Sequence, residues 1–244
     1  MYKPCSIIGI LDDGWDGLSG HARARLAGAS CVIGAGRPLE LVAPHLATPA
    51  KQFDRDGALM RVPEWITAAL SEGQTVAVLA TGDPLCHGIA NMLLDKIGAA
   101  NIEILPAPST VQLAFARLGR PWQQAQIVSV HSKDADEWFS GATPQHGLYA
   151  LVRAVAEHDL LAAFTSPENG PERIARALLA VGYGDELRLS VASRLLLPDE
   201  EVNADLSLSD AAARKFASPN IVVIERIASQ PRRALFGFAD AEYV

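Results

Sequence analysis

The chain of 244 residues is predicted to be an α/β protein with two consecutive α/β domains. Short apolar runs typical of buried strands alternate with longer periodic runs typical of helices, the pattern of parallel sheets with helical crossovers. The pattern pauses at Gly119-Arg120-Pro121 and then restarts. We therefore expect a first domain over residues 1–120, a second over 121–227 and a tail over 228–244.

In the first domain, apolar runs bounded by turn residues predict strands at 6–11, 30–34, 75–80 and 102–105. Periodic segments between them predict helices at 19–27, 38–46, 63–71, 84–97 and 111–118, with a loop over 49–61. Ser19 is a suitable N-cap for its helix, and Gly119 stops the last one.

The same reasoning predicts strands at 126–130, 160–165, 187–192 and 221–225 in the second domain. Its helices are expected at 144–157, 171–181 and 209–216. Gly182 ends the second of these, because glycine readily adopts the left-handed conformation found after a helix.

The amino-acid composition and charge indicate in which cell compartment the protein works and which partners it disfavours. Hydrophobic residues make up 49% of the chain and charged residues 20%, which is enough for sizeable cores. The net charge of −7 disfavours nonspecific binding to nucleic acids or membranes. The N-terminus lacks a signal-peptide pattern, and the three cysteines suit a reducing compartment. We expect a cytoplasmic protein.

Four turns that follow predicted strands are rich in small, hydroxyl or acidic residues: 12–17, 81–83, 106–110 and 165–170. In a parallel sheet, such turns lie at the carboxyl edge, where ligands bind. Each turn alone has ordinary turn chemistry as its simpler explanation. Together they favour a ligand cleft between the two domains.

The turn Thr81-Gly82-Asp83-Pro84 has two interpretations. Asp83 can be the N-cap and Pro84 the first residue of the following helix, which stabilises a helix by about 1 kcal/mol and needs no ligand. Alternatively, the turn presents its backbone to a ligand. The local residues favour neither.

Known catalytic and metal-binding patterns are missing from the sequence. It contains no P-loop, no Gly-x-Gly-x-x-Gly, no Gly-x-Ser-x-Gly and no histidine or cysteine spacing typical of metal sites. We expect no metal and assign no catalytic residue. His131, in His131-Ser132-Lys133, ends a predicted strand and either contacts an anionic substrate or is simply solvated.

The ordered motifs resemble the tetrapyrrole methylases over about residues 5–226. The resemblance is carried by Thr81-Gly82-Asp83-Pro84-Leu85-x-x-Gly88, the segment from Ile104 to Gly119, Ile127 to His131, Gly182-Tyr183-Gly184-Asp185, Leu197-Pro198-Asp199-Glu200, and Ser218 to Ile224. The segment from Pro108 to Gly119 and the Ser129-x-His131 strand end are most similar to the precorrin-6 methyltransferases of cobalamin biosynthesis.

This resemblance implies S-adenosylmethionine bound in the cleft, and a homodimer. By resemblance, the cofactor-binding residues are Gly9, Asp13, Thr81, Gly82, Asp83, Ser109, Thr110, Phe164 and Thr165. The substrate-binding residues are His131 and Ser132. The first loop departs from the family's Gly-x-Gly-Pro-Gly, because it reads Gly9-Ile10-Leu11-Asp12-Asp13-Gly14.

The implied reaction is methyl transfer to a precorrin-6 intermediate, at ring carbon 5. Positioning of the reactants supplies most of the catalysis, because the acceptor carbon is already electron-rich. The tail from Arg233 to Tyr243 resembles the start of a second methyltransferase and decarboxylase half in fused enzymes. A sister methylase with another precorrin or uroporphyrinogen substrate, a methylase of RNA or of a modified histidine, and a non-catalytic cofactor-binding scaffold are the alternatives.

Overall fold

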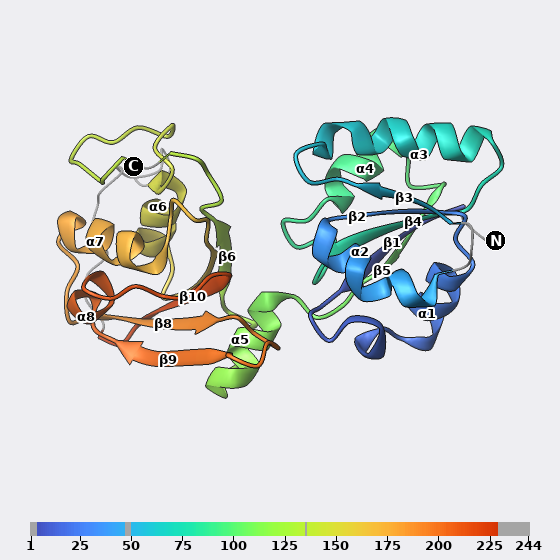
Figure 1. The fold of residues 1–244 in the computed structure, drawn as a ribbon. Coiled ribbons are helices and arrows are strands. Elements are labelled where there is room, and N and C mark those ends of the chain that lie inside the picture. Colours follow the sequence, from blue (N-terminus) through green and yellow to red (C-terminus); the bar gives the residue numbers. More distant parts are fainter. Residues whose placement is uncertain (1–3, 47–49, 135, 229–244) are drawn as a thin grey trace. The chain divides into compact units, whose positions relative to one another are not determined.

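The computed structural model describes residues 4–46, 50–134 and 136–228. It consists of two compact units, Met1–Ser109 and Thr110–Val244, and each contains one five-stranded sheet with packed helices (Figure 1). The predicted α/β class is therefore confirmed. The predicted tail lies outside the described residues, apart from Ala228.

The first sheet is entirely parallel, with the order β3-β2-β4-β1-β5. Its strands are β1 (Cys5–Ile10), β2 (Cys31–Gly34), β3 (Lys51–Asp54), β4 (Val76–Thr81) and β5 (Ile102–Leu105). Strand β3 lies where we predicted a loop. It is a short edge strand with the sequence Lys-Gln-Phe-Asp, so it lacks the apolar run that marks a buried strand.

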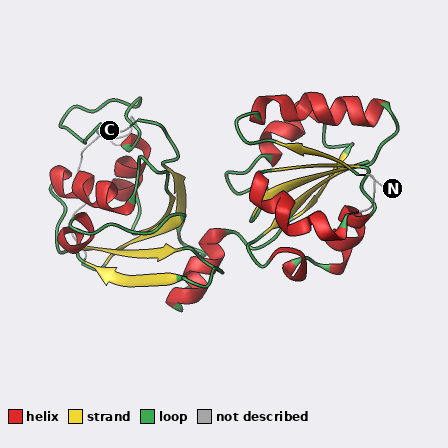
Figure 2. Cartoon of the chain, in the orientation of Figure 1, coloured by secondary structure: helices red, strands yellow, loops and turns green. Residues whose placement is uncertain are grey.

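Helices cover both faces of this sheet (Figure 2). They are α1 (Gly20–Ala27), α2 (Gly36–Val42), α3 (Val62–Ser71) and α4 (Ala90–Ile97), with 3-10 turns η1 (Gly14–Gly17), η2 (Ala43–His45) and η3 (Leu59–Arg61). Successive residues of β1 enter opposite cores: Ile7 packs in the cluster with α3 and α4, and Ile8 in the cluster with α1 and α2. The predicted cap of α1 is confirmed, because Ser19 Oγ accepts a hydrogen bond from Ala22 N at 3.2 Å.

The second sheet has the order β6-β7-β10-β8-β9 and is mixed rather than parallel. Its strands are β6 (Gln126–Ser129), β7 (Leu160–Phe164), β8 (Leu187–Ser193), β9 (Glu201–Leu206) and β10 (Asn220–Arg226). Only β6 and β7 pair in parallel. The carboxyl ends of β6, β7 and β8 therefore share an edge with the start of β10. Strand β9 was not predicted, because it is a polar strand at the edge of the sheet.

Four helices accompany this sheet: α5 (Thr110–Leu118), α6 (Tyr149–Glu157), α7 (Pro171–Val181) and α8 (Leu208–Ala212). Helices α6, α7 and α8 share one core with β7 and β8, whereas α5 packs on the other face. The predicted bounds of α7 are confirmed, with Gly182 in the left-handed conformation at φ 95°. The domain boundary after residue 120 stays a prediction, while the structure groups α5 with the second sheet.

Candidate functional site

Three chain segments meet at Gly9, near the carboxyl edge of the first sheet. Gly9 lies beside Ala80 of β4, and the turns that follow β4 and β5 close over it. A Cβ atom built on Gly9 would lie 2.2 Å from Gly82 O and 2.3 Å from Ala107 N. Only glycine allows this backbone approach. Gly9 therefore has a structural role that the sequence motif alone did not reveal.

Two hydrogen bonds join the three segments at Gly9, a junction of β1 with the turns after β4 and β5 that we call the glycine crossing. Gly82 N donates to Ile10 O at 3.0 Å, and Ala107 N donates to Gly82 O at 3.4 Å. Gly82 itself has φ 68°, a conformation that other residues adopt only with strain. Of the predicted cofactor-binding residues, the structure thus brings Gly9 and Gly82 into direct proximity. Thr81 is exposed beside them, at the end of β4.

Asp83 does not cap α4, so the capping interpretation of this turn is wrong. Helix α4 begins only at Ala90, and the preceding residues form turns in which His87 has φ 54°. Asp83 Oδ1 instead accepts a hydrogen bond from Leu85 N at 2.9 Å, which closes a turn of the Asx type. The left-handed residue at 87 delays the helix, because it cannot continue a right-handed helical path. The carboxylate of Asp83 therefore stabilises the turn itself.

The first loop divides its two carboxylates between different partners. Asp12 forms an ion pair with Arg37 of α2. Asp13 is exposed, and its carboxylate lies against the backbone of Gly17, where a Cβ atom would be 2.2 Å from both oxygens. The prediction that Asp13 contacts a cofactor stays a prediction. Ser109 is buried at the end of the first unit, and Thr110 begins α5.

A second group of predicted residues lies together at the edge of the second sheet. His131 Nδ1 is 3.1 Å from Thr165 O. A carbonyl oxygen only accepts hydrogen bonds, so Nδ1 is the donor in this contact. Thr165 Oγ1 lies 2.7 Å from Asn220 O, at the start of β10. Phe164, half-buried, ends β7 and pairs with Ile221.

Two buried residues that the sequence analysis did not single out support this edge. Asn169 is completely buried, and its Nδ2 donates to Ser132 O at 3.1 Å. Arg173, only 4% exposed, donates from Nη1 to Asp134 O at 2.6 Å. A signal for Arg173 did exist, because an arginine on the apolar face of a helix needs polar partners.

Asp134 accepts hydrogen bonds from Gly147 N at 2.5 Å and Asp136 N at 3.0 Å. These bonds, with smaller contributions from His146 and Arg173, lower the pKa of the Asp134 carboxyl. A lowered pKa means that the ionised group stabilises the folded state above the unfolded pKa of about 3.9. That stabilisation is lost as the pH falls through the lower folded value.

We expect Asp134→Asn to lower the free energy of unfolding at pH 7 by about 1–2 kcal/mol, because one amide oxygen replaces two charged acceptors. We also expect its stability to fall less steeply than that of the unmodified protein between pH 5 and pH 3. Urea unfolding at several pH values measures both effects. Asp95→Asn, which removes an exposed carboxylate on α4, is the control. Equal acid slopes for Asp134→Asn and the unmodified chain would contradict the assignment.

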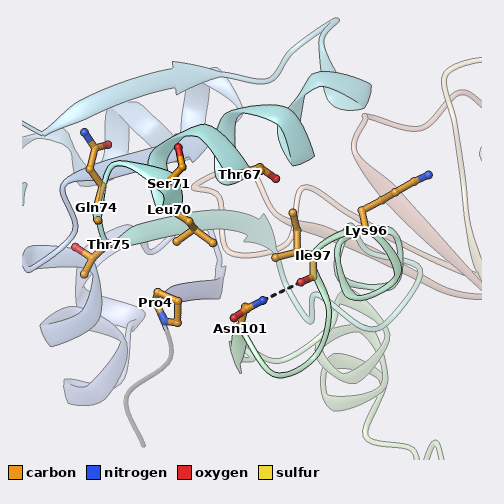
Figure 3. A pocket seen from close by; sticks show the side chains of 10 residues that line it. Pro4, Thr67, Leu70, Ser71, Gln74, Thr75, Lys96, Ile97 and Asn101 are labelled. Atoms are coloured by element: carbon orange, nitrogen blue, oxygen red, sulfur yellow. Dashed lines mark hydrogen bonds between the residues drawn. The ribbon is translucent and has the colours of Figure 1, made fainter.

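A hollow of about 670 Å³ lies at the opposite edge of the first sheet, where Pro4 precedes β1 and Thr75 precedes β4 (Figure 3). Several of its polar side chains are already hydrogen-bonded within the protein, and Thr75 Oγ1 donates to Gly28 O at 2.9 Å. Thr67 Oγ1 donates to Pro63 O at 2.9 Å, and Asn101 Nδ2 donates to Ile97 O at 3.0 Å. This hollow is a surface groove with no unpaired buried polar group in its wall.

The described residues contain no cluster of three or more histidine, cysteine or acidic side chains able to hold a metal ion. Among the same residues, no helix is both long and apolar enough to span a bilayer. The acidic and hydroxyl groups at the edge of the first sheet, Asp13, Thr81 and Asp83, suit a ligand with hydroxyl groups or positive charge better than a phosphate.

Residues 4–210 match the family model of the Tetrapyrrole (Corrin/Porphyrin) Methylases. A precorrin-6Y C(5,15)-methyltransferase [decarboxylating] of Sinorhizobium sp is 34% identical over 202 residues, which are 83% of this chain and 45% of that protein. A cobalt-precorrin-7 C(5)-methyltransferase of Salmonella typhimurium is 32% identical over 160 residues, 63% of this chain and 70% of that protein.

Solved structures share the fold. The methyltransferase CobJ aligns with a TM-score of 0.70 at 18% identity, covering 94% of this chain and 97% of its own. The precorrin-6Y methylase of Archaeoglobus fulgidus aligns with a TM-score of 0.61 at 20% identity, covering 92% and 98%. A uroporphyrin-III C-methyltransferase of Thermus thermophilus, with a TM-score of 0.62 at 16% identity and covering 91% of each chain, was solved with S-adenosylhomocysteine. The chain spans somewhat less than half the length of the precorrin-6Y C(5,15)-methyltransferases that it matches.

Proposed function

The chain belongs to the tetrapyrrole (corrin/porphyrin) methylases, and from this premise we propose that it transfers a methyl group from S-adenosylmethionine to a precorrin-6 intermediate of cobalamin biosynthesis. We propose ring carbon 5 as the acceptor, the position named for the Salmonella relative. The observation that carries the proposal is the glycine crossing at Gly9. It leaves backbone and small side chains at the carboxyl edge of β1, β4 and β5, where an open parallel sheet binds its ligand.

The residues at this edge fit S-adenosylmethionine. Gly9 and Gly82 let the backbone approach a ligand closely. Thr81 offers a hydroxyl group, and the carboxylates of Asp13 and Asp83 suit hydroxyl, amino and sulfonium groups. We propose that these residues, with Ser109 and Thr110, contact the cofactor. Phe164 and Thr165 of the second unit stay in the proposed set by family resemblance.

When bound, S-adenosylmethionine supplies an electrophilic methyl group on a positive sulfur. The chain's own contribution is to hold the donor rigidly, since the hydrogen-bonded crossing at Gly82 leaves the turn little freedom. His131 and Ser132 are proposed to bind the acceptor. The hydrogen bond from Nδ1 of His131 to Thr165 O orients the ring and leaves Nε2 for a contact with the acceptor.

Several further properties belong to the same proposal. The Sinorhizobium relative is more than twice as long as the segment that it shares with this chain, which supports a fused or associated second methyltransferase and decarboxylase unit. A homodimer and a cytoplasmic location are proposed from the family resemblance and the acidic composition.

Incubation with methyl-labelled S-adenosylmethionine and a panel of precorrins tests the proposal. Label transfer to a precorrin-6 intermediate would support it. Transfer only to another precorrin would assign a sister methylase, and cofactor binding without any transfer would leave a scaffold role.

We expect Asp83→Ala to weaken S-adenosylmethionine binding by about tenfold, because the turn loses the hydrogen bond from Leu85 N, with an effect of about 0.5–1.5 kcal/mol, together with a charge beside the ligand. Calorimetric titration measures the affinity. Asp83→Asn can still accept the bond from Leu85 N and should lose less. The pH profile of methyl transfer should keep its shape in both variants. A limb of the profile that disappears with Asp83→Ala would instead indicate general base catalysis by Asp83.

A further inference from the structure

Side chains from the loop over 165–170 and from α7 form hydrogen bonds with the backbone of the turn that follows β6. Ser132 O accepts hydrogen bonds from Ser166 Oγ at 3.0 Å and from Asn169 Nδ2 at 3.1 Å. The same Asn169 Nδ2 lies 3.2 Å from Asp134 O. Two carbonyls that flank a single residue, Lys133, are thus bound by one completely buried amide.

Arg173 completes the support. Its guanidinium donates to Asp134 O, to Asp136 O and to Asn169 Oδ1, so it orients the Asn169 amide with its NH2 group toward the turn. Within the turn, Asp134 N donates to Ser132 Oγ at 3.0 Å. Hydrogen bonds from buried side chains restrict the backbone that they bind, so this network limits the motion of the turn.

The turn after β6 carries a positive charge on the side chain of Lys133. Lys133 is exposed, and within residues 4–46, 50–134 and 136–228 its ammonium makes no hydrogen bond or ion pair. The adjacent carboxylate of Asp134 is occupied by Gly147 N and Asp136 N. His131 lies two residues before Lys133, and its ring is hydrogen-bonded to Thr165 O. The edge therefore combines a fixed backbone with an unpaired positive charge.

We propose that Lys133 binds a peripheral carboxylate of the tetrapyrrole acceptor, and that Asn169 and Arg173 are positioning residues that hold Lys133 in place. This inference rests on the proposed function, and it adds a specificity residue and its support. A polycarboxylate acceptor matches an ammonium that has no other partner, because ion pairs with a carboxylate are stronger than neutral hydrogen bonds. The hydrogen bonds to the carbonyl groups of Ser132 and Asp134 already order this turn, so binding of the acceptor costs less conformational entropy.

Steady-state methyl transfer with the full chain tests the role of Lys133. Lys133→Gln should raise the KM for the precorrin acceptor about tenfold, while kcat and the affinity for S-adenosylmethionine change less than about twofold. Lys133→Arg should restore most of the loss. Lys96→Gln is the matched control, because Lys96 is exposed at the hollow on the opposite edge of the first sheet (Figure 3). An unchanged KM in Lys133→Gln would overturn the proposal.

A double-mutant cycle tests the positioning role. Asn169→Asp keeps the size of the side chain and its contact with Arg173, but it cannot donate to Ser132 O and Asp134 O. It should raise the acceptor KM about threefold to tenfold, and adding it to Lys133→Gln should cause little further change. Fully additive effects on KM would show that Asn169 acts only through general stability, and would overturn the positioning role.

Binding of uroporphyrin III, a tetrapyrrole whose peripheral side chains all carry carboxylates, separates failure of the inference from failure of the proposed function. Fluorescence titration of the unmodified chain and of Lys133→Gln needs no turnover. If the unmodified chain methylates no precorrin, the proposed function fails, and about tenfold weaker uroporphyrin binding by Lys133→Gln would still support the carboxylate site. Equal binding by both proteins, together with an unchanged KM where turnover occurs, would reject that site.

Discussion

Gly9→Ala is expected to abolish measurable binding of S-adenosylmethionine and to lower the free energy of unfolding of the first unit by about 3 kcal/mol. The new methyl group would lie 2.2 Å from Gly82 O and 2.3 Å from Ala107 N. Both neighbours are backbone atoms, so relief requires the turns after β4 and β5 to move apart. Calorimetric titration with S-adenosylhomocysteine and urea unfolding measure the two effects.

Gly20→Ala is the matched control for this substitution. Gly20 begins α1, and no atom lies within 4 Å of a Cβ built there. Alanine favours a helix over glycine, so this variant should bind normally and be as stable as the unmodified chain or slightly more so. Normal cofactor affinity in Gly9→Ala would show that the crossing does not form the binding edge.

Phe115→Ala is expected to lower the free energy of unfolding of the second unit by about 3–5 kcal/mol. Phe115 on α5 is completely buried and packs in one cluster with Ala162 of β7 and Val223 of β10. Its removal leaves a cavity between the helix and the second sheet. Urea unfolding of the full chain, followed by hydrogen exchange in each sheet, measures the loss and locates it.

Phe139→Ala removes a phenylalanine that is 56% exposed in the same unit, so it should change stability by less than about 1 kcal/mol. Loss of protection in β7 and β10 is expected for Phe115→Ala alone. An equally small effect of Phe115→Ala would show that α5 is not part of the second core, and would favour the domain boundary predicted after residue 120.

The first sheet could be predicted almost strand by strand, because its central strands are buried on both faces and appear as continuous apolar runs. The edge strands β3 and β9 were missed for the converse reason. Strand β3 reads Lys-Gln-Phe-Asp and β9 reads Glu-Val-Asn-Ala-Asp-Leu, so polar side chains interrupt any apolar run in both. The antiparallel pairing of β8, β9 and β10 was also missed, since hydrophobic periodicity carries no information on strand direction.

The turn after β4 shows where local reasoning reached its limit. The sequence Asp83-Pro84 is a good helix start by local preference. In the folded chain, Asp83 binds Leu85 N, and the turns through His87 delay α4 until Ala90. The expectation that this turn and the loop after β1 lie at the same edge of the sheet is confirmed, because β1 and β4 are parallel neighbours.

The sequence by itself determined the α/β class, the family and the turns that carry the proposed cofactor residues, because all of these are local patterns in a set order. Only the tertiary structure decided why Gly9 must be glycine, since the atoms that exclude a side chain belong to Gly82 and Ala107. It also showed that Asn169 and Arg173, more than 30 residues further along the chain, form hydrogen bonds with the backbone beside Lys133. Such contacts depend on which strands are neighbours, and periodicity within one segment does not encode that.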